Sequence, residues 1–566
     1  MSETNPLTLL LLVALGAYFL WLVFRRLQLS VAKHPSLTGH SKIARRLSKR
    51  VPDYSFTKAE AFACDSPPKD VFERRSSAFE RLSEQLRAQS TGSIELTRAL
   101  DGGISDLNFT SRYRVPYQFS EVVKAHIPDQ IFVEASEGVR IKDVDGHWYY
   151  DVGGSYGVNL FGYDFYKACT EEAIKTVGSL GPVLGPYHPI VVDNVRRLKA
   201  IAGMDEASFH MSGTEAVMQA VRLARYHTGQ KKIVTFCGAY HGWWDDVQPG
   251  VGNPVGTANT LMLRDMDNRA LRILNTRRDI ACVLVNPLQA LHPNKAAPGD
   301  GTLLSNGRTA GYDKEAYASW LKRLREVCTK RGIALIIDEV FLGFRLAPGG
   351  AQEYFDVRAD LVTYGKTLGG GLPVGALCGT NRWMQRYKPE QPANICFARG
   401  TFNAHPLVMA TMNAFLNKLE EPEVRAMQLD VDELWDARSA SINEQLKRQE
   451  LPISIAHMAS VWTFVYQLPT RYNWMLQFYL RAQGLSLSWV GSGRFIFSHN
   501  YDEKDFEEVC NRVIAGAKAM QADGWWWTSA ESPSVKKQLA REFLDARQSG
   551  RRPNKELEAL TNARGS

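Results

Sequence analysis

Two short apolar runs, each ending abruptly at a charged residue, constrain the fold of this chain more than any other feature. Residues 334–337 read Ala-Leu-Ile-Ile and stop at Asp338, and residues 362–364 read Val-Thr-Tyr and stop at Gly365-Lys366. Short apolar runs bounded by turn residues predict buried strands. A strand buried in a parallel sheet is apolar on both faces, so charge appears only where it ends. We therefore predict a mostly parallel α/β sheet with Asp338 and Lys366 facing one crevice at its carboxyl edge.

An amine and a carboxylate presented in one crevice suit the chemistry of pyridoxal 5'-phosphate. Lys366 would form a Schiff base with the cofactor aldehyde, and Asp338 would keep the ring nitrogen protonated. The glycines at 369–371 would allow close backbone approach. Taken alone, Asp338 could equally be a helix cap and Lys366 a surface lysine. A phosphate-binding P-loop is excluded, because position 360 is Asp where that motif needs Gly.

An apolar segment of membrane-spanning length opens the chain. Residues 7–24 carry no charge and, as a helix, would be ~27 Å long, close to the ~30 Å hydrocarbon thickness of a bilayer. Basic residues follow this run at Arg25 and Arg26, which argues against a cleaved signal peptide and puts the chain after residue 25 in the cytoplasm. We expect a single-pass membrane protein with an N-terminal transmembrane helix and a cytoplasmic catalytic body.

Charge and cysteine content exclude several other classes of function. The net charge of +8 arises largely near the two ends of the chain, so we expect no nucleic-acid partner. The eight cysteines are scattered without a C-x-x-C pair, and several lie in apolar runs. This predicts buried free thiols in a reducing compartment, with neither a disulfide framework nor a metal site.

Three further stretches carry candidate cofactor contacts. Ser212-Gly213-Thr214 precedes a predicted helix over 215–228. The free N–H groups and hydroxyls of these three residues would bind a phosphate, although an ordinary helix cap has the same sequence pattern. Tyr240 follows a predicted strand over 233–236, and its ring could stack on a flat cofactor. Gln289 follows another over 282–285 and could donate a hydrogen bond to the ring oxygen of the cofactor.

The segment 153–157, Gly-Gly-Ser-Tyr-Gly, matches the G-x-S-x-G pattern of a hydrolase nucleophile. No periodic helix follows it, so we interpret it as a glycine-rich loop after a hairpin predicted over 141–151. Ser155 and Tyr156 are then candidate substrate contacts.

We divide the chain into six segments by pattern and composition. The predicted segments are a membrane anchor (1–26), a basic linker with one helical patch (27–105), the first part of a small domain (106–180), a large cofactor-binding domain (181–425), the rest of the small α+β domain (426–530) and a basic helical tail (531–566). The tryptophans at 525–527 either meet the bilayer interface or are buried under the N-terminal segment, and we favour burial.

In their order along the chain, these stretches resemble class III pyridoxal-phosphate-dependent aminotransferases. The resemblance runs from about residue 104 to 525 and is carried by residues 212–218, 238–242, 337–340, 348–352, 364–375 and 400–402. The sequence is similar to glutamate-1-semialdehyde aminomutase and closer still to the aminotransferase domains of hybrid polyketide/nonribosomal-peptide synthases.

The resemblance implies a fold-type I transferase, a homodimer and active sites at the subunit interface. It implies that Lys366 forms the Schiff base, that Asp338 pairs with the ring nitrogen, and that His241 supports the site from behind. Val340 and Tyr240 would contact the two faces of the ring, and Gln289 would contact the ring oxygen. The phosphate would be bound by Ser212, Gly213 and Thr214, and by Thr401 from the other subunit. Two positions depart from the pattern. Asn286 stands where relatives often have Glu, and Arg399 is either a carboxylate ligand or a surface or interface arginine.

The function implied is transfer of an amino group from an amino-acid donor to a hydrophobic carbonyl acceptor. A long-chain aldehyde or a 3-oxoacyl compound, used in secondary-metabolite or lipid assembly, is the expected acceptor class. An aminomutase, which returns the amino group to its own substrate, is the first alternative. A membrane-tethered scaffold with a dead site is the second, and the intact Lys366 and Asp338 argue against it.

Overall fold

The computed structural model describes residues 6–34, 37–100, 102–128, 130–291, 310–488, 493–531 and 533–548. Its centre is a seven-stranded sheet with the order β4-β10-β9-β8-β7-β5-β6. The strands are β4 (Glu206–His210), β5 (Lys232–Phe236), β6 (Thr260–Leu263), β7 (Ile280–Val285), β8 (Ala334–Asp338), β9 (Leu361–Gly365) and β10 (Gly375–Gly379). All neighbouring pairs from β9 to β6 are parallel, and β10 runs antiparallel to both β9 and β4. The predicted mostly parallel sheet is confirmed.

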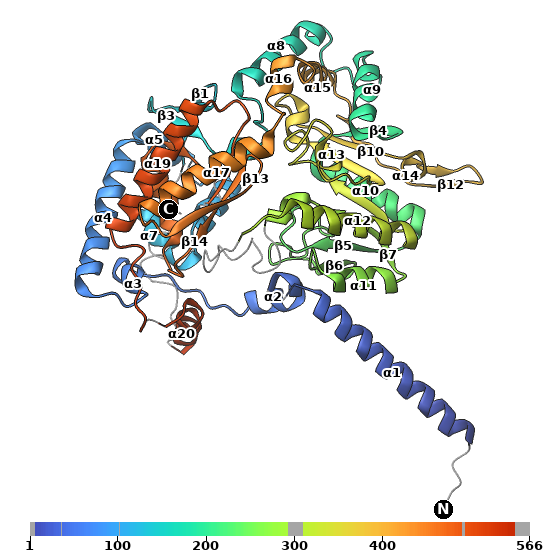
Figure 1. Ribbon diagram of the computed structural model, residues 1–566, viewed down its shortest axis with the longest axis horizontal. Helices are drawn as coiled ribbons and strands as arrows, with labels where there is room; N and C mark the ends of the chain where they lie inside the picture. Colours follow the sequence, from blue (N-terminus) through green and yellow to red (C-terminus); the bar gives the residue numbers. More distant parts are fainter. Residues whose placement is uncertain are drawn as a thin grey trace, which may run out of the picture.

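The pairing and burial of the central strands determine which residues lie next to one another at the ends of β8 and β9. Every residue of β7, β8 and β9 is buried, as expected for strands covered on both faces. Asp338 pairs with Thr363, and Gly365 pairs with Gly375. The covering helices include α9 (Ile190–Ala202), α10 (Gly213–Thr228), α11 (Asn268–Thr276), α12 (Lys314–Arg331), α13 (Gly350–Tyr354) and α14 (Asn381–Met384). α8 (Tyr163–Val177) packs against α15 (Pro406–Lys418) beside this sheet (Figure 1).

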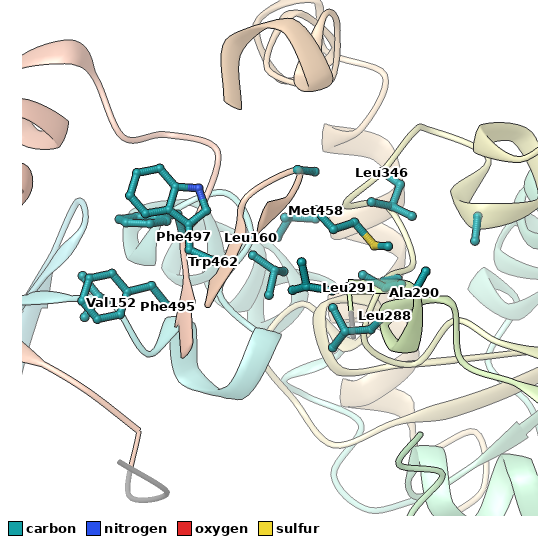
Figure 2. Close-up of a cluster of buried hydrophobic side chains, with 14 of the residues drawn as sticks. Val152, Leu160, Leu288, Ala290, Leu291, Leu346, Met458, Trp462, Phe495 and Phe497 are labelled. Carbon is teal, nitrogen blue, oxygen red and sulfur yellow. The ribbon is translucent and has the colours of Figure 1, made fainter. Parts of the chain in front are cut away.

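A smaller α+β lobe packs against the sheet domain. Its antiparallel sheet comprises β13 (Ile453–Met458), β14 (Val461–Tyr466) and β16 (Arg494–Ile496), covered by α17 (Val431–Arg448) and α19 (Glu503–Ala522) (Figure 1). Figure 2 shows how the lobes share one core: Met458, Trp462 and Phe497 of this sheet and its exit lie with Leu288 and Leu291 from the loop after β7. The two lobes are therefore joined by one hydrophobic core.

The second small sheet joins residues from both halves of the chain. It consists of β1 (Val133–Glu137), β2 (Arg140–Asp143), β3 (Trp148–Asp151) and β15 (Leu485–Ser486). The predicted hairpin is present, with Ile141 opposite Tyr149. β15 lies parallel to β3 and is followed at once by residues that reach the site.

The described residues between 37 and 126 form an N-terminal layer of helices. Up to residue 99 this layer contains more regular structure than the basic linker with one helical patch that we predict for residues 27–105. The layer comprises α2 (Ser41–Ser48), α3 (Lys58–Ala63), α4 (Lys69–Ala88), α5 (Thr91–Ala99), α6 (Ser105–Tyr113) and α7 (Ser120–His126). The predicted apolar face of α4 is buried at Phe79, Leu82 and Leu86. α4 packs on α18 (Leu476–Ala482) of the small lobe. Spacing revealed only α4, because the other helices are short.

Trp525 and Trp526 are buried beneath this N-terminal layer. Their indole N–H groups donate to the hydroxyl of Tyr479 and the side-chain oxygen of Asn473, at 2.8 and 2.9 Å. The ring of Trp525 meets Phe62 of α3 edge-on. Burial, the alternative that we favoured, therefore applies to these two residues. α20 (Val535–Gln548) follows, and residues 549–566 of the predicted tail lie outside the described residues.

A buried ion pair within the N-terminal layer predicts a stability effect, and its arginine also contacts the small lobe. The fully buried Arg75 makes two hydrogen bonds to Asp65, at 2.7 and 2.8 Å, and donates to the carbonyls of Phe62 and Gly524. Removal of one partner leaves a buried, uncompensated charge, so Arg75→Ala should lower the free energy of unfolding by about 3–5 kcal/mol. The exposed Arg74→Ala should change it by less than about 0.5 kcal/mol. Chemical denaturation measures both, and equal effects would contradict this account.

α1 (Pro6–Ala32) is longer than the predicted segment and continues directly into the body. Leu7–Ala32 is long and apolar enough to cross a membrane, with a mean hydropathy of 2.5 and an exposed surface. Its last turn is anchored: Ala32 is buried, and its carbonyl accepts a hydrogen bond from the backbone N–H of Arg264 at 3.0 Å. Arg25 donates to the carbonyl of Thr276 in α11. α1 projects away from the body as a single rod (Figure 1).

Candidate functional site

A cavity of about 750 Å³ lies where the carboxyl ends of β8 and β9 meet the small lobe. Nine of the residues predicted for the site line it: Tyr156, Ser212, Gly213, Thr214, Tyr240, His241, Asp338, Val340 and Lys366. They come from five separate stretches of the chain. The sheet brings them together because parallel strands end at one edge.

Asp338 is buried, and its two carboxylate oxygens are held by hydrogen bonds. One accepts from Nδ1 of His241 at 2.8 Å, and the other from the Val340 N–H and the Thr363 hydroxyl, each at 3.1 Å. Thr363 is its partner across the β8–β9 ladder, so the register of the sheet sets this contact. The arrangement orients a carboxylate into the cavity, suited to a cationic group there.

Lys366 follows β9 in a left-handed backbone conformation, with φ of 47°. Such a conformation is uncommon for a residue other than glycine and is often found at functional sites. Burial lowers the pKa of the Lys366 amine, and the charge of Asp338 opposes that shift. A larger share of this lysine is therefore neutral near pH 7 than of an exposed lysine.

The lowered pKa of Lys366 predicts how its reactivity depends on pH. In the cofactor-free protein, labelling of Lys366 by trinitrobenzenesulfonate should have its midpoint below the value of about 10.4 for an ordinary lysine. Asp338 raises the pKa, so Asp338→Asn should move that midpoint to still lower pH. Mass spectrometry of the labelled peptide across a pH series measures both, and a shift upward in the variant would contradict the assignment.

The start of α10 provides a site for an anion. Ser212 caps the helix, since its hydroxyl accepts from the Glu215 N–H at 3.3 Å. The N–H groups of Gly213 and Thr214 lie in the first turn, where no carbonyl of the helix can bind them. A Cβ atom at Gly213 would come within 2.5 Å of Val340. The close packing of helix and strand thus requires glycine and keeps these N–H groups at the cavity wall.

Tyr240 and His241 both line the cavity, but the first is exposed and the second is buried. Tyr240 is 62% exposed, and its carbonyl accepts a hydrogen bond from Asn286 at 3.0 Å. His241 is buried against Asp338, and within the described part of the chain its Nε2 has no hydrogen-bond partner. His241 therefore supports the Asp338 carboxylate from behind and also lines the cavity.

Four predicted site residues do not line this cavity. The hydroxyl of Ser155 contacts the Tyr163 hydroxyl at 3.1 Å rather than a histidine, which disfavours the hydrolase alternative. Gln289 is buried beside Asp265. Arg399 donates to the Gly185 carbonyl, and Arg399 and Thr401 are both exposed.

Arg494 lines the cavity and was missed from the sequence. It begins β16, directly before the buried Phe495 and Ile496. A charge at the end of a short apolar strand is the same signal that identified Asp338, but this strand is only three residues long. Among the described residues that line the cavity, those with an acidic side chain or a lysine or arginine side chain are Asp338, Lys366 and Arg494.

Comparisons with known proteins agree with this geometry. The family described as "Aminotransferase class-III" matches residues 122–247 and 308–487. Glutamate-1-semialdehyde 2,1-aminomutase of Methanocaldococcus jannaschii is 34% identical over 345 residues, which cover 58% of this chain and 72% of that protein. The enzyme of the same name from Alkaliphilus oremlandii is 34% identical over 307 residues, covering 51% and 67%.

Solved structures share the fold. A transaminase with PLP bound is 27% identical with a TM-score of 0.57, and the match covers 70% of this chain and 92% of that one. A glutamate-1-semialdehyde aminomutase from Pseudomonas aeruginosa PAO1 has a TM-score of 0.63 at 19% identity, covering 80% and 99%. The fold-type I architecture that we predicted is therefore confirmed.

Proposed function

Because the chain belongs to the class-III aminotransferase family, whose cofactor is pyridoxal 5'-phosphate, we propose that it transfers an amino group from an amino-acid donor to a hydrophobic carbonyl acceptor. The observation that carries this proposal is the cavity in which Lys366, Asp338 and Arg494 meet between largely apolar walls. The first half of such a reaction takes the amino group from the donor, and the second half gives it to the acceptor. Each of the three side chains has a separate task in these two halves.

The residues present fit the cofactor. The amides of Gly213 and Thr214 would hold its phosphate, Asp338 its cationic ring nitrogen, and Val340 and Tyr240 the two faces of the ring. His241 would keep the Asp338 carboxylate oriented through their 2.8 Å hydrogen bond. Bound there, the cofactor supplies an electron sink for the bond that breaks at the α-carbon of the donor.

Lys366 would both attach the cofactor and move the proton. Its neutral amine, favoured by the lowered pKa, takes the proton from the donor α-carbon as a general base. In the second half it returns a proton to the carbon of the acceptor carbonyl.

Arg494 is suited to the carboxylate of the amino-acid donor. Guanidinium groups bind carboxylates with two parallel hydrogen bonds, so they fix orientation as well as charge. Position 286, where relatives often have Glu, is Asn, and its amide is bound to the Tyr240 carbonyl. Position 286 therefore adds no negative charge to the cavity wall.

The apolar part of the wall supports a hydrophobic acceptor. It includes Val158, Val217, Leu288, Phe341, Leu372, Pro373, Val374 and Ile496. Burial of alkyl groups against such a wall favours acceptors with a hydrocarbon chain. The acceptor class that we propose is a long-chain aldehyde or a 3-oxoacyl compound.

An amino-donor panel with these acceptors tests the proposal. The wild-type enzyme should release a keto acid from its donor in proportion to the amine formed. Arg494→Gln should raise the KM for the donor roughly a hundredfold through loss of a charged hydrogen-bonded pair. Arg74→Gln, at an exposed arginine of α4 paired with Asp70, is the matched control. Absence of a keto-acid product with every donor would contradict the proposal.

The second candidate function is that of an aminomutase, favoured by the names of the relatives. An aminomutase keeps the amino group on one substrate and releases no keto acid. A donor labelled with ¹⁵N separates the two: transfer puts the label in a new amine, whereas isomerisation leaves it in the carbon skeleton that brought it.

We propose further that the enzyme is a homodimer anchored to a membrane by α1, with its body in the cytoplasm. Thr401 and Arg399 are exposed in one chain, as residues that complete the site of a second copy would be. The exposed apolar surface of α1, followed by basic residues, supports the anchor. Retention in the membrane fraction after an alkaline carbonate wash tests it, and release by the wash would contradict it.

A further inference from the structure

We propose that α2 and the exposed face of α11 form a docking surface for the anionic headgroups of a membrane, at the base of α1. The docking surface consists of Lys42, Ile43, Arg46, Leu47 and Lys49 from α2 and its C-cap, with Arg269 and Arg272 from α11. The inference rests on the proposed membrane anchor and deepens it. The anchor determines where the chain enters the bilayer, whereas the docking surface determines which lipids the body contacts.

α2 leaves an apolar stripe and a basic stripe exposed side by side. Ile43 and Leu47 are 51% and 43% exposed. Successive residues of an α-helix lie about 100° apart around its axis, so Lys42, Arg46 and Lys49 form a stripe next to them. A helix that combines basic and large apolar residues in this way is suited to lie in the membrane interface. The apolar stripe favours lipid over a nucleic acid, whose phosphates bind basic residues.

The positive charge at the base of α1 is not balanced within its own segment. Residues 25–50 contain eight lysines and arginines and no Asp or Glu. Burial, and then the charges of Lys42 and Arg26, lower the pKa of Lys33, so these cations repel one another. The cytoplasmic leaflet, on the side where we propose the body to be, has a negative surface potential that attracts such clusters. Charge complementarity therefore favours an anionic leaflet as the partner.

α11 adds basic residues on another side of α1. Its apolar residues, which include Leu271 and Leu274, are buried against the body, whereas Arg269 and Arg272 are exposed. The carbonyl of Thr276, at the C-terminal end of α11, accepts a hydrogen bond from Arg25 of α1 at 3.2 Å. The exposed arginines of α11 therefore lie on a helix that ends directly beside the proposed anchor.

The depth of the anchor brings both helices within reach of the headgroups. Arg25 is the first charge after the apolar run of residues 7–24, and it marks the edge of the hydrocarbon. From Arg25 to Ala32, which is buried in the body, the helix rises about 10 Å. A headgroup layer is roughly 5–8 Å thick. The body thus begins within a Debye length of about 8 Å from the headgroups.

α2 is held to the body and does not swing freely below it. Ala44 is the buried residue of α2, and Arg45 donates to the carbonyl of Pro254 at 2.6 Å. At the end of α1, the Nε of Arg264 donates to the carbonyl of Lys33 at 3.0 Å. Figure 1 shows α2 at the end of α1 that meets the body. Contact of the docking surface with the leaflet would therefore orient the whole body relative to the membrane.

Fluorescence quenching in lipid nanodiscs tests this docking with the full-length chain. Ser48→Cys provides an exposed position in α2 for an environment-sensitive fluorophore, and some of the lipids carry a nitroxide on the headgroup. The fluorophore should be quenched in mixed discs of phosphatidylcholine and phosphatidylserine, and much less in phosphatidylcholine alone. High salt should remove the difference, because it screens the charges. The chain without Ser48→Cys, labelled in the same way, corrects for dye on native cysteines.

Charge reversal in α2 should abolish the dependence on phosphatidylserine. Each Lys or Arg near an anionic leaflet favours contact roughly fivefold, so reversal of three should lower the ratio of docked to undocked protein at least about a hundredfold. The variant is Lys42→Glu/Arg46→Glu/Lys49→Glu. A second variant, Arg269→Glu/Arg272→Glu, leaves α2 intact and should cause a smaller loss. The matched control, with the same change in net charge at exposed positions of α17 and α19, is Lys447→Glu/Arg448→Glu/Lys518→Glu.

The outcomes separate the docking surface from the anchor. Quenching that needs phosphatidylserine in the wild type and in the control, but not in the α2 variant, supports the docking surface. If the α2 variant keeps this quenching, or if the wild type shows none, the docking surface is wrong although the anchor stands. Release of the wild type by alkaline carbonate overturns both. If the wild type instead binds an RNA oligonucleotide through the same residues and ignores phosphatidylserine, the partner is a nucleic acid and the proposal fails.

Discussion

Lys366→Ala should reduce amino transfer by roughly 10⁴-fold or more, since one side chain provides both the covalent attachment and the proton transfer. Lys366 is the one lysine among the described residues that line the cavity. The start of α10 and the Asp338 carboxylate remain in the variant, so it should still bind the cofactor without a covalent bond. Steady-state rates measure the loss, and equilibrium dialysis measures the retained binding.

A matched control separates the role of Lys366 from the general effect of losing a lysine. Lys167 is an exposed lysine of α8 paired with Asp164, and Lys167→Ala should keep the wild-type rate. Circular dichroism should be the same for both variants. Activity of Lys366→Ala within tenfold of the wild type would show that another group moves the proton.

Asp338→Asn is expected to have the second largest effect, a loss of roughly 10²–10³-fold in kcat. The amide has the same shape but carries no charge to hold the ring nitrogen of the cofactor protonated. The loss cannot be attributed to Lys366, because removal of Asp338 lowers the pKa of that amine and increases its neutral fraction. Loss of the charge at the ring nitrogen should lower kcat, whereas a larger neutral fraction of Lys366 should raise it. A net loss of activity therefore reports on the ring nitrogen.

His241→Gln distinguishes orientation of the carboxylate from its charge. The variant leaves the charge of Asp338 in place and removes one of its three hydrogen bonds. It should lose less activity than Asp338→Asn. Asp356→Asn, at an exposed carboxylate paired with Lys322, is the control and should match the wild type. A wild-type rate in Asp338→Asn would refute the role assigned to the carboxylate.

The centre of the site could be predicted from the sequence because buried parallel strands have a strong signature. β8 and β9 are buried throughout, so Asp338, the last residue of β8, and Lys366, directly after β9, stand out as the first charge of each run. The Ser212-Gly213-Thr214 stretch at the start of α10 and the hairpin of β2 and β3 have equally local signals. These features depend on few residues, each close in the chain to the others.

Other parts of the site depend on contacts between distant segments, which spacing does not reveal. Arg494 reaches the cavity only because β16 pairs with β14. Gln289 follows its strand as expected, yet the turn after β7 places it beside Asp265 rather than in the cavity. In the N-terminal layer only α4, with 20 residues, is long enough to show a periodic pattern. The other helices of this layer have six to nine residues, and helices this short depend on packing rather than on a pattern visible in the sequence.

The central claim is that Lys366 is the side chain that holds the cofactor. Reduction of the loaded enzyme with borohydride, followed by digestion and mass spectrometry, tests this most directly. The account predicts one modified peptide, with the pyridoxyl mass on Lys366. A modification on any other lysine, or an unmodified protein after loading with pyridoxal 5'-phosphate, would contradict it.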